Sequence, residues 1–439
     1  MIKISLIKKF LSRRDLQIFL ILLLVYTINL RVIGTYGHRY VTVSIIKELD
    51  FDLDEYVVYM NGTAGVISPT GHFALVRHIG NTILATPIFF FPVIFYDIEY
   101  HTWFVPYLGK LAATIYTALS AVFIYYALKR LTKEKYALYI TLIYAFGTMC
   151  WSTSSQGMWS YGFSQFLISV SIYLLVRGLK DEKYVAYTGL LLAMSVVCTL
   201  TDFLILVVCA VYILHKHRKQ FMKFAIFAIL PLIFLLAYNN YYLGSPFRSL
   251  TIQLEGNRPY NFLKGFSGLL ISPSRGLFVY SPILIFALYG VYDAWKKRKI
   301  LFCYFTIMIL LVIGVYSRIE IWYGGHSWGP RHMCNILPFF SILLLPGFEK
   351  AMKKKNLKYI FILFLIFSVF IQLEGILFFN GEWHRKYDIG AKDQSWLWSI
   401  DNTQIVYYLK NPNPETLKWY NYVFYNIFGK TVFPSRYSI

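Results

Sequence analysis

The sequence reads Lys296-Lys-Arg-Lys299, then Ile300-Leu-Phe-Cys-Tyr-Phe-Thr-Ile-Met-Ile-Leu-Leu-Val-Ile-Gly-Val-Tyr316, then Ser317-Arg-Ile-Glu-Ile-Trp-Tyr-Gly-Gly-His-Ser-Trp-Gly-Pro-Arg-His332. A cluster of basic residues is thus followed by an apolar run, and the run by a gap rich in Trp, His, Gly and Arg. An apolar run needs roughly 17–25 residues to cross a bilayer as a helix. Runs of this kind recur along most of the chain, so their spacing decides the fold.

The polar gaps between the apolar runs are of two kinds, and the two kinds alternate. In a membrane protein, short loops rich in Lys and Arg stay in the cytoplasm. The gaps that mix Trp, His, Arg and carboxylates therefore all fall on the opposite, outer face. The basic gaps are Lys129-Arg130, Arg177 to Lys183, His215 to Lys219, Lys296 to Lys299 and Lys350 to Lys358.

The composition indicates an all-α membrane protein. Of 439 residues, 57% are hydrophobic and only 15% are charged, whereas a soluble protein carries about 25% charged residues. The net charge of +21 would suggest nucleic acid as a partner of a soluble protein. Here much of the excess lies in the basic gaps, where it meets anionic membrane lipids. We therefore expect a multi-pass protein of the cell membrane that binds no nucleic acid.

The apolar runs predict about 11 spanning helices, with further helices on the outer surface. The basic N-terminus stays in the cytoplasm, and an odd number of crossings places the C-terminus outside the cell. The expected spans are residues 16–33, 105–128, 136–150, 160–176, 184–201, 203–214, 224–242, 277–293, 300–316, 334–348 and 358–379.

Residues 79–96 do not fit as a full span, because a crossing there would invert every later basic gap. Pro87 and Pro92 also remove backbone donors from this stretch. We expect a re-entrant or membrane-surface helix on the outer side, with an ordinary span as the alternative. The predicted domains are a transmembrane domain, 1–379, with a first outer loop, 34–104, and an extracytoplasmic tail, 380–439.

An acidic turn lies in the first outer loop, at Asp50-Phe-Asp-Leu-Asp-Glu55. Four close carboxylates raise one another's pKa and suit a general base or a divalent cation. The alternative is a solvated acidic turn with no chemical role. Asp202 stands between two apolar runs, where an ionisable residue suggests either a functional group or a helix cap.

The later outer gaps carry cationic and aromatic candidates. Arg275, in Ser272-Pro-Ser-Arg-Gly276, stands at the start of a helix and suits an anion, with a lipid-headgroup anchor as the alternative. Arg331 suits a carboxylate or a phosphate. Aromatic faces beside polar groups bind sugars, which is our reading of Trp322, His326 and Trp328, although tryptophans at this level are often interfacial anchors.

Several of these segments resemble motifs of the GT-C superfamily of membrane glycosyltransferases, in particular an uncharacterised prokaryotic branch. The superfamily includes protein O-mannosyltransferases and the aminoarabinose transferase of lipid A. The resemblance implies a cytoplasmic N-terminus, a long first outer loop, many spans, and an outward-facing site that takes a sugar from a polyprenyl-phosphate carrier. The resembling segments are Arg39-Tyr40 with Ser44-Ile-Ile, Asp50 to Glu55, Ser152 to Trp159, Ser272 to Gly276 and Trp322 to Arg331.

The resemblance also implies roles for residues. Members of the superfamily keep a catalytic Asp just before the Arg-Tyr pair, but Gly34-Thr-Tyr-Gly-His38 contains no acid. Asp52 or Asp54 is therefore the expected base, with His38 as the alternative. The other expected substrate contacts are Arg39 and His38 in the first loop, Arg275 and Arg331 on the phosphate, and Trp322, His326 and Trp328 around the sugar.

The remaining expectations concern ligands and rival functions. Residues 79–96 would line the groove for the polyprenyl chain. No cofactor is required, and a divalent cation is optional because Arg can carry the phosphate charge. The acceptor hydroxyl would belong to a lipid, a glycan or a protein. The rival functions are a non-catalytic membrane subunit that kept the fold and a lipid-linked carrier or flippase, which would show internal repeats and charges deep in several spans.

Overall fold

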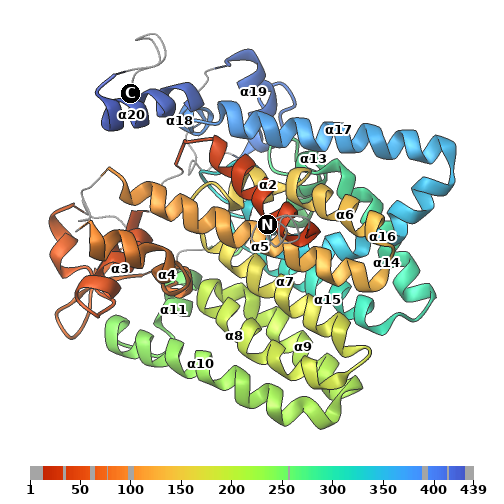
Figure 1. Cartoon of the computed structure of the whole chain (residues 1–439), viewed down its shortest axis with the longest axis horizontal. Coiled ribbons are helices and arrows are strands. Elements are labelled where there is room, and N and C mark those ends of the chain that lie inside the picture. Colours follow the sequence, from red (N-terminus) through yellow and green to blue (C-terminus); the bar gives the residue numbers. More distant parts are fainter. Residues whose placement is uncertain are drawn as a thin grey trace, which may run out of the picture.

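The computed structural model describes residues 13–32, 36–59, 65–76, 78–96, 103–255, 258–387, 394–412 and 415–430. Parts of the predicted first outer loop (34–35, 60–64, 77 and 97–102) and of the tail (388–393, 413–414 and 431–439) lie outside the described residues. The described chain is helical apart from one two-stranded antiparallel sheet, in which Val66 of β1 (Gly65–Ile67) pairs with Ala74 of β2 (Phe73–Leu75). The prediction of an all-α protein is confirmed at this level (Figure 1).

The helices follow one another along the chain with few long connections. The α-helices are α2 (Arg14–Ile28), α3 (Tyr36–Lys47), α4 (Gly80–Phe95), α5 (Val105–Leu131), α6 (Glu134–Phe146), α7 (Ser160–Gly178), α8 (Thr188–Cys198), α9 (Phe203–Lys216), α10 (Phe221–Leu243), α11 (Arg248–Glu255), α12 (Phe262–Ile271), α13 (Leu277–Tyr280), α14 (Ala287–Lys296), α15 (Ile300–Tyr316), α16 (Leu337–Lys353), α17 (Lys355–Phe378), α18 (Glu382–Lys386), α19 (Gln404–Lys410) and α20 (Glu415–Phe428). Short 3-10 or π segments are η1 (Asp54–Tyr59), η2 (Cys150–Ser154), η3 (Glu182–Tyr187), η4 (Leu200–Asp202), η5 (Arg218–Gln220), η6 (Pro282–Phe286), η7 (Arg331–Ile336) and η8 (Ser395–Leu397).

Four helical stretches in the described chain are long and apolar enough to cross a membrane: Val105–Leu131, Arg218–Leu243, Arg331–Lys353 and Lys355–Phe378. Each contains or overlaps a predicted span. The structure does not bear out the full count of about 11, since most of the other predicted spans form shorter or interrupted helices and α7, with 19 residues, is not apolar enough along its length.

Two of the interrupted spans show why the count differs. The predicted span 184–201 begins as the 3-10 segment η3 and becomes an α-helix only over α8. The predicted span 277–293 is divided into α13, η6 and α14, with Pro282 at the junction. Proline lacks the backbone N–H that a continuing helix would need. Apolar composition predicted helix here, but it did not predict where the helix breaks.

The five basic gaps gather at one end of the helical bundle, which we call the basic end. A cavity of about 380 Å³ is lined by Leu131, Leu179, Lys299 and Glu349, so four of the gaps meet around it. The fifth joins them through His217, whose Nδ1 lies 3.7 Å from the carboxylate of Glu182. In Figure 1 the turns from α9 to α10 and from α16 to α17 lie at the right, and α3 lies at the left. The basic gaps, which alternate with the other gaps along the sequence, therefore lie together at one end of the bundle in space.

The bundle is tightest where α14 meets α16. Gly290 of α14 lies so close to the carbonyl of Leu343 that a Cβ there would come within 1.7 Å of the oxygen. Gly347 of α16 has the same relation to the carbonyl of Phe286, at 2.1 Å. Small residues let helix backbones approach and gain packing where water supplies no driving force. This packing makes α16, which follows directly on η7, a fixed support for Arg331.

Residues 79–96 form one helix, α4, in spite of Pro87 and Pro92. Its inner side is buried along Ala85, Phe89 and Val93, and packs on α3, α5, α7 and α8. Its outer side exposes large aromatic and aliphatic groups, at Phe90, Phe91, Ile94 and Phe95. A helix of 16 residues is short for a bilayer crossing. Its place at the membrane surface or partly within the membrane stays a prediction.

Candidate functional site

The acidic turn of the first loop is anchored on the end of α10. The ring of Phe51 makes edge-to-face contacts with Phe234, Tyr238 and Tyr242, at centroid distances of 5.9, 6.1 and 6.3 Å. The hydroxyl of Tyr242 also accepts a hydrogen bond from the Phe51 amide at 3.3 Å. Edge-to-face aromatic pairs of this kind stabilise a fixed orientation. These contacts hold the carboxylates that follow Phe51 in place against the end of α10.

His72 joins two of these carboxylates. Its Nδ1 lies 3.2 Å from Asp52 and 2.8 Å from Asp54. Asp52 is buried, whereas the side chain of Asp54 is 41% exposed. Asp54 also accepts a hydrogen bond from the Phe73 amide at 2.5 Å. The sequence identified the carboxylates but assigned no role to His72, which reaches them only because the β1–β2 hairpin folds back over the turn.

The cluster has shifted proton affinities. Burial raises the pKa of Asp52 above its ordinary value of 3.8. The hydrogen bond that His72 donates to the carboxylate of Asp54 raises the pKa of His72 above 6.5. For both groups the folded protein favours the protonated form. The protonated form of His72 strengthens the contact between hairpin and turn, and this contribution is lost as pH rises through the raised pKa of His72.

We expect the hairpin to exchange its amide protons faster as pH rises above 6.5, once the intrinsic pH dependence of exchange is removed. The reason is that protonated His72 makes a stabilising contact in the folded state. This stabilisation is fully present at pH values below the ordinary pKa of His72, and it is lost as pH rises through the raised pKa. Hydrogen exchange of residues 65–76 between pH 6 and pH 9 measures this. The His72→Gln variant should show no such slope, and an unchanged slope in that variant would refute the assignment to His72.

The same cluster has the ligand types that a divalent cation prefers. One ligand atom from each of Asp52, Asp54 and His72 lies within 4.8 Å of the others, and Asp50, Asp52 and Glu55 form a second such group. Carboxylate oxygens suit hard cations, and an imidazole nitrogen suits a transition metal. These residues fit the optional cation of the sequence-based prediction, which stays a prediction.

Arg275 is fully buried and ties a loop to the tail. Its guanidinium donates to the carbonyls of Ser327 at 2.5 Å, Gly329 at 3.0 Å and Gly325 at 2.9 Å. It also lies 2.6 Å from Nε2 of His384. Burial lowers its pKa to about 10, so it stays charged at neutral pH. Its Nε has no hydrogen-bond partner among the described residues, but an anion could reach the two terminal nitrogens only by displacing these protein acceptors.

The three residues expected around the sugar do not share one surface. Trp322 and Trp328 are completely buried. The ring of Trp322 packs on Gly268, and that of Trp328 packs on Gly375 and meets Tyr280 edge to face at 5.5 Å. His326 is exposed and stacks on His384 at 4.9 Å. Only His326 is accessible to a ligand in this arrangement.

Arg331 forms a second cluster, with Trp159. Its guanidinium lies 4.6 Å from the centre of the Trp159 ring. Both Nε of Arg331 and the indole nitrogen of Trp159 are buried without a hydrogen-bond partner among the described residues. Buried donors are nearly always paired in native proteins, and a cationic donor pairs best with an anion. Sequence analysis placed Trp159 in an outer gap without assigning it a role.

His332 links this cluster to the surrounding helices. Its ring stacks on Tyr316 at 4.3 Å, and Tyr161 lies 3.4 Å from its Nδ1. The hydroxyl of Tyr316 in turn lies 2.9 Å from that of Thr201. These contacts connect Arg331 with the end of α15 and the start of α9.

Asp202, next to Thr201, is buried and accepts hydrogen bonds from Ser164 and from Asn335. The Asn335 contact is 2.8 Å long and fastens the α8–α9 turn to η7, the segment that begins at Arg331. Asp202 stands at the N-cap position of α9 but makes no side-chain capping bond. Tertiary contact, rather than helix capping, is thus what this carboxylate provides.

His38 and Arg39 both lie on α3. His38 is buried, and the guanidinium of Arg39 lies 5.4 Å from the centre of the Tyr40 ring. α3 packs on α4 and β2, so these residues share the first-loop structure with the acidic turn.

No model of a known protein family matches this chain, and no curated protein matches it. The function is therefore inferred from the chemistry of the two clusters and from the motif resemblance.

Proposed function

We propose that this chain is a membrane glycosyltransferase that moves a sugar from a polyprenyl-phosphate carrier to an acceptor hydroxyl at the outer face of the cell membrane. The observation that carries the proposal is the presence of two chemically distinct clusters in segments that lie at the ends of their helices away from the basic gaps. One is the acid–histidine group of Asp52, Asp54 and His72. The other is Arg331 beside Trp159, with two unpartnered donors.

The charge distribution supports the proposed orientation. Lys and Arg are retained on the cytoplasmic side of membrane proteins, and all five basic gaps lie at the basic end. The two clusters would then face outward. About 11 crossings, with the N-terminus inside and the C-terminus outside, follow from the same rule.

The proposed reaction needs a cation for the leaving group and a base for the acceptor. The bond between the sugar carbon and the phosphate oxygen breaks, and the acceptor oxygen forms a new bond to that carbon from the opposite side, so the configuration inverts. Arg331 stabilises the charge that develops on the departing lipid phosphate. The hydroxyl proton passes to a carboxylate of the acidic turn. Asp54 is the more exposed of the two candidates, while Asp52 and His72 hold it in position.

Transfer of labelled sugar tests the proposal. Membranes that contain the protein are supplied with a radiolabelled polyprenyl-phosphate sugar, and product formation is followed. Asp54→Asn should lower the rate by roughly 10²–10⁴, the usual contribution of a general base, and Asp52→Asn should also lower it. Glu48→Gln, an exposed carboxylate of the same loop, serves as the control with unchanged rate. Full transfer by both Asp variants would refute the site, and no transfer from a range of donors would favour a non-catalytic subunit.

Cysteine labelling tests the orientation separately. His326→Cys, at the end that carries the clusters, should react with a membrane-impermeant maleimide on intact cells. Lys354→Cys, at the basic end, should react only after the membrane is opened. Both positions are exposed, so accessibility within the protein does not limit either reaction. The reverse pattern would invert the proposed topology.

A further inference from the structure

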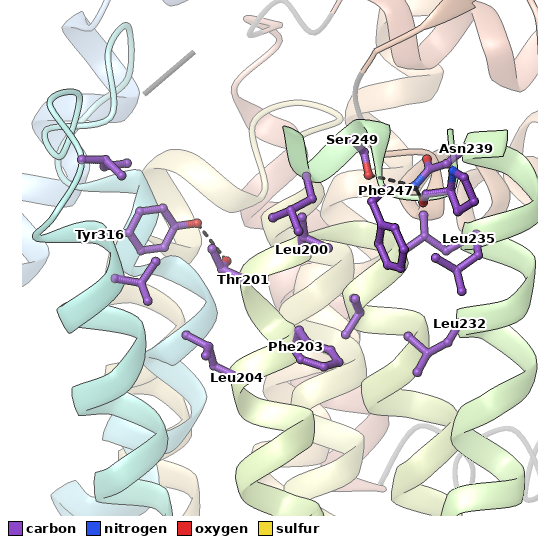
Figure 2. A pocket seen from close by; sticks show the side chains of 16 residues that line it. Leu200, Thr201, Phe203, Leu204, Leu232, Leu235, Asn239, Phe247, Ser249 and Tyr316 are labelled. Atoms are coloured by element: carbon purple, nitrogen blue, oxygen red, sulfur yellow. Dashed lines mark hydrogen bonds between the residues drawn. The ribbon is translucent and has the colours of Figure 1, made fainter. Parts of the chain in front are cut away.

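A pocket of about 440 Å³ opens between α9, α10, α11 and α15, near the ends of these helices that lie away from the basic gaps (Figure 2). Its wall is almost entirely hydrocarbon. Leu204, Leu232 and Leu235 point into it from α9 and α10, and Tyr316 closes it on the α15 side. Nothing in the sequence analysis pointed to this pocket, because its walls come from segments more than a hundred residues apart.

The rim of the pocket lies on the lipid-facing flank of the bundle. Phe203 is 47% exposed, Val315 is 42% exposed and Phe247 is 60% exposed. Exposed groups of this size are normal where a helix faces lipid and costly where it faces water. An occupant would therefore enter sideways, from the bilayer.

The few polar groups in the wall are already satisfied. The Thr201 and Tyr316 hydroxyls pair at 2.9 Å. The side-chain amide of Asn239 donates to Ser249 and to the carbonyl of Pro246, each at 2.9 Å. The pocket thus presents few polar groups, and each already has a partner in the described wall, so the ester carbonyls of a glycerophospholipid would find little to pair with and their burial would be unfavourable. A chain of pure hydrocarbon suits it.

The pocket leads toward the unpartnered donors. Tyr316, which lines it, stacks on His332, and His332 follows Arg331 in the chain. We propose that the pocket holds the first part of the isoprenoid chain of a polyprenyl phosphate, with the phosphate at Arg331 and Trp159. At roughly 30 Å³ for each water-sized unit the pocket accommodates about 15 such units, which is the order of size of a short isoprenoid segment of about three units. The identity of the head group rests on the proposed function.

This placement differs from the one expected from sequence. The groove predicted at residues 79–96 corresponds to the exposed face of α4. None of the residues that line the pocket belongs to that helix. The two surfaces therefore make separate predictions about which peptides a bound chain would touch.

Photo-crosslinking tests the inference without requiring transfer. The full-length protein in membranes is exposed to a polyprenyl phosphate that carries a diazirine on its chain, and labelled peptides are mapped. We expect adducts on α9, α10 or α15. Leu204→Trp fills the pocket from its half-buried α9 wall and should reduce labelling at least tenfold. Leu214→Trp, an exposed position of the same helix outside the pocket, should leave labelling unchanged. Leu235→Trp fills the pocket from α10, so it repeats the test should Leu204→Trp fail to fold.

The outcomes separate the pocket from the proposed function. Unlabelled polyprenyl phosphate should compete with the probe, and a phosphatidylglycerol should not; equal competition would assign the pocket to ordinary phospholipid and overturn the inference. Adducts confined to 80–95 would overturn it in favour of the α4 surface. Labelling that Leu204→Trp abolishes, without transfer from any donor, supports the pocket while the transferase proposal fails. Transfer that Leu204→Trp leaves intact refutes the pocket while the transferase proposal stands.

Discussion

Arg275→Met is expected to prevent the chain from reaching a stable folded state. The substitution removes the guanidinium that donates hydrogen bonds to the carbonyls of Ser327, Gly325 and Gly329 and contacts Nε2 of His384. These acceptors lie in a site from which water is largely excluded. Each buried group left unpaired costs about 1–3 kcal/mol, and whole domains are stable by only about 5–15 kcal/mol. The loop and the tail would therefore separate.

Expression in membranes and the midpoint of thermal unfolding in detergent measure this effect. Arg275→Lys should destabilise the fold almost as much, because a single ammonium group cannot reach all the acceptors that the planar guanidinium contacts through its two terminal nitrogens. Arg318→Met is the control, since Arg318 is exposed and only lies over the ring of Phe262. If Arg275→Met folds with an unchanged midpoint but transfers no sugar, Arg275 binds the anion after all and the structural role is wrong.

Arg331→Met is expected to lower the rate of transfer strongly while leaving the fold intact. Its Nε has no partner among the described residues, and its contact with Trp159 is worth about 0.5–2 kcal/mol. Loss of one preorganised charge that stabilises a developing anion lowers the rate by about 10²–10³. The thermal midpoint should move only slightly. Arg275 and Arg331, both predicted from sequence as phosphate ligands, would thus give opposite patterns.

The measurement is the rate of sugar transfer beside the thermal midpoint of the same preparation. Arg331→Lys should keep part of the rate because the positive charge remains. The rate should still be lower than in the wild type because lysine cannot bind a phosphate in the bidentate geometry of arginine. Arg385→Met provides the matched control, because it removes an exposed arginine that lies 3.9 Å from the carboxylate of Glu382. Undiminished transfer by Arg331→Met would remove Arg331 from the site.

The elements of the fold were predictable because each helix needs only its own residues. An apolar run forms a helix in a membrane since the backbone must satisfy itself there, and the basic gaps mark one side. The predicted runs accordingly became helices, and the basic gaps meet at one end. Helix ends were harder to predict. The break at Pro282 and the 3-10 start before α8 depend on local backbone geometry that hydrophobicity does not report.

The candidate site was predictable only as a set of residue types. Asp52 and Asp54 were found because four acids stand together, but His72 was not, since the hairpin that brings it to them is a tertiary contact. Trp322 and Trp328 were expected at a sugar site from their residue type, yet both are buried, Trp322 against Gly268 and Trp328 against Gly375. Residue type indicates what a side chain can bind, and burial decides whether it is accessible.

The sequence by itself determined that the chain is helical, with apolar helices and a basic end. The reason is that the length of an apolar run and the charge of a loop are local properties that need no tertiary partner. Only the tertiary structure distinguished Arg275, whose two terminal nitrogens donate to backbone carbonyls, from Arg331, whose guanidinium lies over the ring of Trp159; the buried Nε of each has no partner in the described chain. It also created the pocket beside Tyr316, whose walls come from several separate helices. The reason is physical: free donors and empty volume are properties of what surrounds a residue, and in this chain those surroundings come from segments far away in the sequence.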